Sequence, residues 1–84
     1  MLFHGRVQGV GFRYSARRIA KRHPITGYVR NRADGTVELV ARGTSSAIEA
    51  FLREIETAFH GSIDSREMQP ADPEETFELF DIRF

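Results

Sequence analysis

The residues best suited to chemistry lie in one short segment near the N-terminus, Gly5-Arg6-Val7-Gln8-Gly9-Val10-Gly11-Phe12-Arg13. The segment joins a predicted strand to a predicted helix, and the first backbone N–H groups of a helix have no partner inside it. These groups carry partial positive charge and can bind an anion, and glycines at 9 and 11 let successive N–H groups converge on it. Arg13 can add a bidentate contact to phosphate oxygens. The segment therefore predicts a phosphate-binding loop, although the two glycines alone are more typical of a tight turn without a ligand.

A second candidate is Asn31, the last residue of Gly27-Tyr28-Val29-Arg30-Asn31. The helix predicted between the two segments is a crossover connection, so its flanking strands run parallel if they are neighbours. Their C-terminal ends then lie at the same edge of the sheet, with the loop after one and Asn31 at the other. A carboxamide beside a bound phosphate can hold a water molecule, because it both donates and accepts hydrogen bonds. Taken singly, Arg13 is typical of a solvated helix face and Asn31 of a strand end or turn.

Hydrophobic periodicity predicts the elements that hold these residues in place. Strands are expected over residues 2–8, 25–31, 36–42, 63–69 and 77–84. Helices are expected from Phe12 to about Arg22, and from a serine cap at 45 or 46 to the residue before Gly61. A loop at 70–76 divides the last β segment. The order β-α-β-β-α-β predicts an α+β, ferredoxin-like sandwich: an antiparallel sheet with two helices on one face, and a single domain over residues 1–84.

Composition narrows the class of protein. The 84 residues contain no cysteine, which excludes disulfides and a thiolate nucleophile. Five phenylalanines are expected in the core: Phe51, Phe59, Phe77, Phe80 and Phe84. Residues 1–42 hold nine basic and two acidic residues, and residues 43–84 hold three and ten, so charges of +7 and −7 cancel. A positive half can attract an anion, or the two halves can simply pair their surfaces. No stretch is long and apolar enough to span a bilayer and none resembles a signal peptide, so a cytoplasmic location is expected.

The motif at 5–13, with Gly-Tyr-Val-Arg-Asn at 27–31 and Asp-Gly-Thr-Val-Glu at 34–38, resembles the acylphosphatase family. The resemblance covers the whole chain and is strongest over residues 5–43. It implies the ferredoxin-like fold and the hydrolysis of acyl phosphates by direct attack of an oriented water. It also implies a monomer that needs no metal or cofactor and binds neither nucleic acid nor membranes. Inorganic phosphate would be the product and a competitive inhibitor.

The resemblance also implies the role of each site residue. The loop amides would bind the substrate phosphate, and they belong to Gln8, Gly9, Val10, Gly11 and Phe12. Arg13 would hold the phosphate and stabilise charge in the transition state, and Asn31 would position the attacking water. No general base is evident near the loop, which fits a reaction that depends on positioning and charge stabilisation.

Two other functions remain as alternatives. An acylphosphatase-like domain can bind a phosphate compound inside a larger enzyme, as in the hydrogenase-maturation carbamoyltransferases. RNA-recognition domains share the element order, but they need exposed aromatic residues on the central strands, and residues 36–42 contain none.

Overall fold

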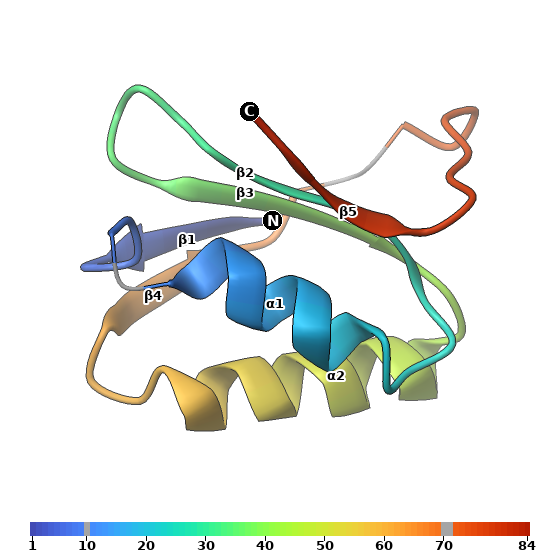
Figure 1. The fold of residues 1–84 in the computed structure, drawn as a ribbon, viewed down its shortest axis with the longest axis horizontal. Coiled ribbons are helices and arrows are strands. Elements are labelled where there is room, and N and C mark those ends of the chain that lie inside the picture. The colour runs from blue at the N-terminus through green and yellow to red at the C-terminus, as the bar shows by residue number, and fades with distance from the viewer. Residues whose placement is uncertain (10, 70–71) are drawn as a thin grey trace.

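A computed structural model describes residues 1–9, 11–69 and 72–84 of the chain. The described residues form β1 (Leu2–Gly5), α1 (Phe12–Ala20), β2 (Thr26–Asn31), β3 (Val37–Arg42), α2 (Ser45–Ala58), β4 (Ile63–Glu67) and β5 (Phe80–Arg83), as Figure 1 shows. This order confirms the predicted α+β, ferredoxin-like fold. Most elements are a few residues shorter than predicted. The first strand ends at Gly5, not Gln8, and its pairing with β4 shifts register between His4 and Gly5.

The five strands form one sheet in the order β4-β1-β3-β2-β5. Neighbours are antiparallel except β2 and β5, which run parallel, so the sheet is mixed and not wholly antiparallel as predicted. β1 and β2 are not adjacent, since β3 lies between them and is antiparallel to both. They therefore still run in the same direction, and their C-terminal ends lie at the same edge of the sheet.

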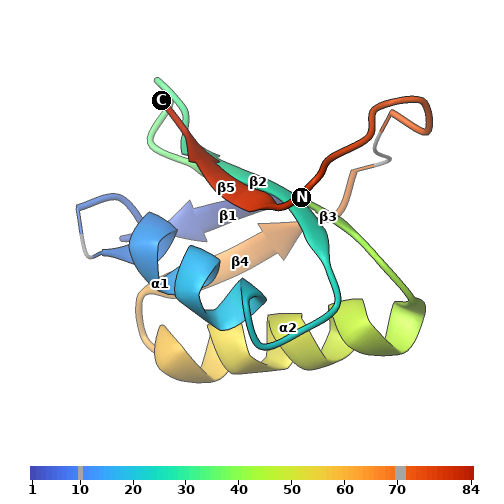
Figure 2. The same ribbon diagram turned by 45° about the vertical axis from the view of Figure 1, so that its right-hand side comes forward.

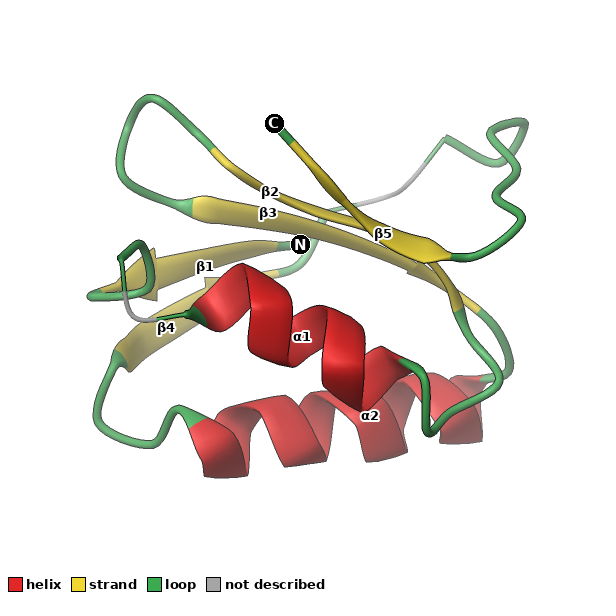
Figure 3. Ribbon diagram, in the orientation of Figure 1, coloured by secondary structure: helices red, strands yellow, loops and turns green. Residues whose placement is uncertain are grey.

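Both helices lie on one face of the sheet, and the core fills the space between (Figures 2 and 3). Phe12, at the first position of α1, is 1% exposed, with its ring centroid 5.2 Å from that of Phe3 and 4.8 Å from that of Phe59. Burial of aromatic surface of this size is strongly stabilising, so Phe12 fixes where α1 begins. Among the described residues, neither helix is both long and apolar enough to cross a membrane.

Three local predictions need correction. Phe51, Phe59 and Phe80 are buried as expected. Phe77 is only half-buried, and Phe84 is 94% exposed because it lies beyond the end of β5. The cap of α2 is Thr44 rather than Ser45 or Ser46: its Oγ1 accepts a hydrogen bond from the N–H of Ala47 at 3.1 Å.

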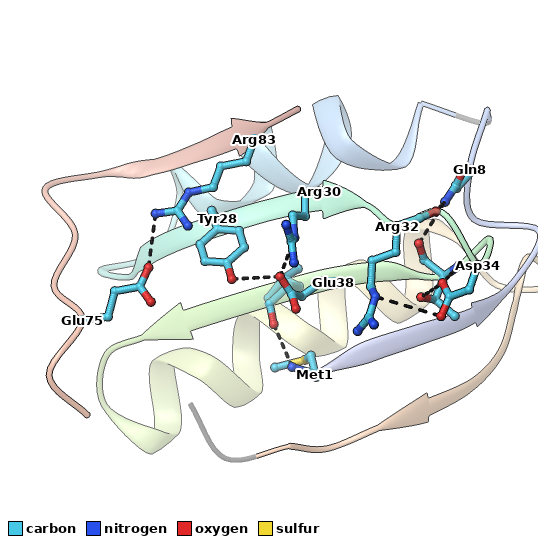
Figure 4. A network of polar contacts seen from close by, with 11 residues as sticks. Met1, Gln8, Tyr28, Arg30, Arg32, Asp34, Glu38, Glu75 and Arg83 are labelled. Carbon is cyan, nitrogen blue, oxygen red and sulfur yellow. Dashed lines mark hydrogen bonds and ion pairs between the residues drawn. The ribbon is translucent and has the colours of Figure 1, made fainter. Parts of the chain in front are cut away.

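The sheet face opposite the helices carries a polar network (Figure 4). Glu38 accepts hydrogen bonds from the Tyr28 hydroxyl at 2.8 Å and from Arg30 Nε at 2.7 Å. The Arg83 guanidinium lies 3.9 Å from the Tyr28 ring centroid and pairs with Glu75 at 3.2 Å. The network joins β2, β3 and β5, so it fixes the parallel edge strand to the rest of the sheet.

We expect this network to make stability depend on pH. Burial raises the pKa of Glu38, but the hydrogen bonds from Tyr28 and Arg30 outweigh it and hold the pKa below the ordinary 4.5. A lowered folded-state pKa contributes stability above the unfolded value, and this contribution is lost as pH falls through the folded value. Glu38→Gln should therefore lower the free energy of unfolding at pH 7 and reduce its fall below pH 4.5. Urea denaturation at pH 7 and at acid pH measures this, and an equal fall in both proteins would contradict it.

Candidate active site

The loop between β1 and α1 has the backbone conformation of an anion site. Gly9 has φ 79° and Gly11 has φ 76°, both in the left-handed region that glycine favours. A Cβ added at either position would meet nothing within 4 Å, so the requirement for glycine is conformational, not steric. Gly11 is the N-cap of α1 and has no side chain with which to cap the helix, and the first turn of the helix contains no acidic residue. The first N–H groups of α1 are thus left for another acceptor.

The side chain of Gln8 attaches this loop to the hairpin between β2 and β3. Its Nε2 donates to the carbonyl of Arg32 at 2.7 Å and to that of Thr36 at 2.9 Å (Figure 4). Val7, the preceding residue, is fully buried. The start of the loop is therefore fixed by burial on one side and by two hydrogen bonds on the other. The sequence predicted Gln8 as the end of the first strand and as the donor of a phosphate-binding amide, but no local pattern indicates the distant partners of its side chain.

The hairpin that receives Gln8 is itself well ordered by side-chain contacts. Asp34 Oδ1 accepts from the Thr36 backbone N–H at 3.0 Å and from its hydroxyl at 2.6 Å. These two hydrogen bonds hold the pKa of Asp34 below its usual value. Gly35 has φ 91°, as the predicted Asp-Gly turn requires. The Gln8 side chain is therefore bonded to a well-ordered turn, and the first residue of that turn, Arg32, directly follows Asn31.

Asn31 is the last residue of β2, and its side-chain oxygen has no hydrogen-bond donor among the described residues. It pairs with Val37 on β3, and its side-chain Oδ1 is buried yet accepts no hydrogen bond from any residue that the structure describes. A buried polar atom without a partner costs about 1–3 kcal/mol. Such an atom is normally satisfied by ordered water or a ligand. Asn31 is therefore suited to accept a hydrogen bond from a water molecule.

Arg13 lies at the same end of the sheet. Its Cζ is 5.0 Å from the centroid of the Phe84 ring. The last pair of the parallel ladder joins Arg30 to Arg83, so the next residues along the two strands are Asn31 and Phe84. Adjacent strands are about 4.8 Å apart. The Arg13 guanidinium therefore lies over Phe84, just past the strand next to β2, at the sheet edge where Asn31 ends β2.

The positive charge of the Arg13 guanidinium has no acidic partner among the described residues. Arg13 forms no ion pair within residues 1–9, 11–69 and 72–84, whereas Arg17, one turn later on α1, lies 3.5 Å from Asp81. A guanidinium next to uncapped helix N–H groups favours an anion.

The other predicted site residues all belong to the loop and to the first position of α1. Gln8, Gly9 and Gly11 shape the loop, as described above. Phe12 contributes its ring to the core, so only its backbone N–H is available to a ligand. Val10 lies outside the described residues.

Gln8→Ala should loosen the loop. Two hydrogen bonds are lost, each worth about 1 kcal/mol. We expect a free energy of unfolding lower by about 1–2 kcal/mol. Because a loop displaced from its position weakens positioning, turnover should also fall by about tenfold. Thermal denaturation and steady-state kinetics measure the two effects. Gln69→Ala is the matched control, since Gln69 is exposed and its side chain donates a hydrogen bond to Glu67, far from the loop in the sequence. Equal behaviour of the two variants would contradict the docking role of Gln8.

Fold and site together define a ferredoxin-like α+β protein with a glycine-containing loop before α1, an arginine and a carboxamide at one sheet edge. The acylphosphatase family model matches residues 1–82, and the chain belongs to the acylphosphatase family. It is 43% identical to an acylphosphatase of Methanospirillum hungatei, over 99% of this chain and 92% of that protein.

Solved structures give the same result. The crystal structure of acylphosphatase from Bacillus subtilis has a TM-score of 0.87 and 32% identity, covering 99% of this chain and 93% of that one. The crystal structure of T. kodakarensis HypF has a TM-score of 0.81 and 33% identity. In that case 99% of this chain matches only 12% of HypF. The same fold therefore occurs both alone and as a small part of a larger protein.

Proposed function

We propose that this chain hydrolyses acyl phosphates to a carboxylate and inorganic phosphate by direct attack of water. The observation that carries the proposal is the buried side-chain oxygen of Asn31, which accepts no hydrogen bond from the described residues. It ends β2 at the sheet edge where Arg13, which has no ion-pair partner in the described part of the chain, lies over Phe84. Similarity to proteins named acylphosphatase supports it along nearly the whole chain.

The phosphate group binds in the loop. Backbone N–H groups from Gln8 to Phe12 and the Arg13 guanidinium surround its non-bridging oxygens. Glycine at positions 9 and 11 lets these donors point inward, since both residues adopt positive φ. The donors are fixed before the reaction, so they stabilise developing charge without reorganising.

The attacking water is held by Asn31. Its Oδ1 accepts a hydrogen bond from the water and so directs a lone pair of the water oxygen at phosphorus. The new P–O bond forms as the bond from phosphorus to the acyl oxygen breaks, and the acyl group leaves as a carboxylate. One proton of the water stays on the oxygen now bonded to phosphorus, and the other passes to a phosphate oxygen. A carboxylate is a good leaving group, so this scheme needs positioning and charge stabilisation more than an acid or base.

Hydrolysis of benzoyl phosphate and acetyl phosphate by the purified chain tests the proposal. We expect multiple turnovers, with release of one phosphate per substrate and competitive inhibition by inorganic phosphate. Hydrolysis in ¹⁸O-labelled water should place the label in phosphate, because water attacks phosphorus; label in the carboxylate would contradict the mechanism.

A non-catalytic phosphate-binding domain is the second candidate, supported by the match to a small part of HypF. In that case the chain would bind inorganic phosphate or an acyl phosphate without turnover. Calorimetric titration with phosphate beside the hydrolysis assay separates the two functions. RNA binding has less support, because Tyr28, the aromatic residue on the open face of β2, is covered by Arg83 and only 9% exposed.

We also propose that residues 1–84 act as a single domain, monomeric and cytoplasmic. One hydrophobic cluster includes residues of both helices and of four strands, β1, β2, β3 and β5. Only four large apolar side chains in the described residues are exposed, and two of them adjoin Arg13. Sedimentation over a range of concentrations tests the monomer, and cell fractionation tests the location.

A further inference from the structure

A cleft opens beside the second half of β3, at the end of that strand away from the proposed phosphate site. β1 runs next to the first half of β3 only, and its contact ends where Met1 and Leu39 exchange two backbone hydrogen bonds, at 2.8 and 2.9 Å (Figure 4). β3 continues beyond this point as far as Arg42. The cleft has a volume of about 340 Å³, with β3 on one side and Met68 and Gln69, which follow β4, on the other.

The backbone of Ala41 makes this cleft suited to an extended chain. Residues alternate along a strand, so the N–H and C=O of Ala41 point to the same side as those of Leu39, which bond to Met1. Among the described residues, nothing bonds to either group of Ala41 on that side. A strand that entered the cleft in line with β1 would satisfy both groups.

The neighbouring strand fixes the direction of such a chain. A chain in line with β1 runs antiparallel to β3, so its C-terminus is the end that meets Met1. There the α-ammonium of Met1 donates to the carbonyl of Leu39 at 2.8 Å, and an ammonium has three N–H donors in all. Burial lowers the pKa of this group below the ordinary 8.0 and outweighs the opposite effect of Glu38. A carboxylate at this point would gain a charge-assisted hydrogen bond.

Alternation also determines which side chain the penultimate position accepts. That residue lies opposite Ala41, and both Leu39 and Ala41 pack with the core. Ile48 of α2 packs with the same cluster and lines the cleft. An apolar penultimate side chain would therefore be covered on the core side of the sheet.

The last residue of the entering chain lies opposite Val40 and points to the other face of the sheet. Three carboxylates line the cleft, of which Glu38 and Glu75 already pair with arginines. Asp72 forms no ion pair within the part of the chain that the structure describes. It is exposed and available to a basic side chain at this last position.

We propose that this cleft binds the C-terminal end of an extended peptide, with an apolar penultimate residue and a basic last residue, as an added strand antiparallel to β3. The inference is independent of the proposed hydrolase function, because Asn31 lies at the other end of the β2–β3 ladder.

NMR titration of the purified chain with the peptide acetyl-Thr-Thr-Val-Lys tests the proposal. We expect saturable binding and slower hydrogen exchange at the N–H of Ala41. A C-terminal carboxamide should weaken binding by about tenfold, the scale of one charge-assisted hydrogen bond. Methylation of the valine nitrogen should do the same, because it removes the N–H that would bond to the Ala41 carbonyl. Neither change alters the protein, so neither can act through its folding.

Asp72→Asn should weaken binding of this peptide by about threefold, the scale of an exposed ion pair, and leave a norleucine-ended peptide unaffected. Glu74→Gln is the matched control, since Glu74 is exposed on the same segment but does not line the cleft. A chain with Thr-Val-Thr added before Met1 should not bind the peptide, because the added residues would occupy the cleft.

Three results would overturn the proposal. The first is the absence of saturable binding to the wild-type chain, and the second is equal binding by the chain with the added residues. The third is self-association that the peptide displaces, which would show that a second copy occupies the cleft.

Discussion

Arg13→Ala is expected to lower kcat/KM for benzoyl phosphate by at least about a hundredfold, equivalent to some 3 kcal/mol of lost transition-state stabilisation. The guanidinium has no carboxylate partner in the described part of the chain, so its charge is available to the substrate. Because it binds phosphate in the ground state as well, the inhibition constant of inorganic phosphate should rise in parallel. Steady-state kinetics with phosphate as inhibitor measures both. Lysine at this position should restore only part of the activity, since an ammonium cannot make a bidentate contact.

The matched control is Arg18→Ala. Arg18 lies on the same helix and is exposed, so its removal changes the net charge equally without altering the site. We expect nearly normal kinetics from this variant. Comparable losses in the two variants would show that general electrostatic attraction, not a specific contact, accounts for the role of Arg13.

Asn31→Ala is expected to lower kcat by about a hundredfold, the scale seen when one positioned hydrogen-bonding group is removed from an active site. Its effect should differ from that of Arg13 in one respect. Asn31 holds water rather than phosphate in the proposed mechanism, so inhibition by inorganic phosphate should be nearly unchanged. Kinetics with phosphate as inhibitor separates the two roles.

The stability of the Asn31 variant provides an independent test. Asn31 Oδ1 is buried and accepts no hydrogen bond from the described residues, so removing it should not destabilise the fold. We expect a melting temperature equal to or above that of the wild-type protein, together with the loss of turnover. A large drop in melting temperature would indicate that Asn31 is a structural residue.

Topology explains why the main site could be predicted from the sequence. The glycine loop follows β1 and Asn31 ends β2, and both strands run in the same direction. The prediction assumed that the two strands are neighbours, whereas β3 lies between them. The conclusion holds because an even number of antiparallel steps restores the direction. The loop and Asn31 lie at the same sheet edge because β1 and β2 run in the same direction, whether or not the two strands are neighbours.

Contacts between distant segments could not be predicted in this way. The Gln8 side chain bonds to carbonyls at Arg32 and Thr36, and no local motif specifies which carbonyls are within reach. Phe84 was expected in the core because its strand alternates correctly. Alternation gives the side of a strand but not where the covering helices end. The boundary of the core, and with it the aromatic surface beside Arg13, required the structure.

The parallel pairing of β2 with β5 has a consequence for how activity appears during folding. It joins residues 26–31 to residues 80–83, and pairing of segments so far apart in the sequence is slow, so we expect this pairing to form late. The guanidinium, the carboxamide and the terminal phenyl ring come together only when that late step is complete. Recovery of hydrolysis after dilution from denaturant should therefore follow formation of the last edge of the sheet and lag behind the signal from the helices. The rate at which activity returns would therefore report the rate of the final stage of folding.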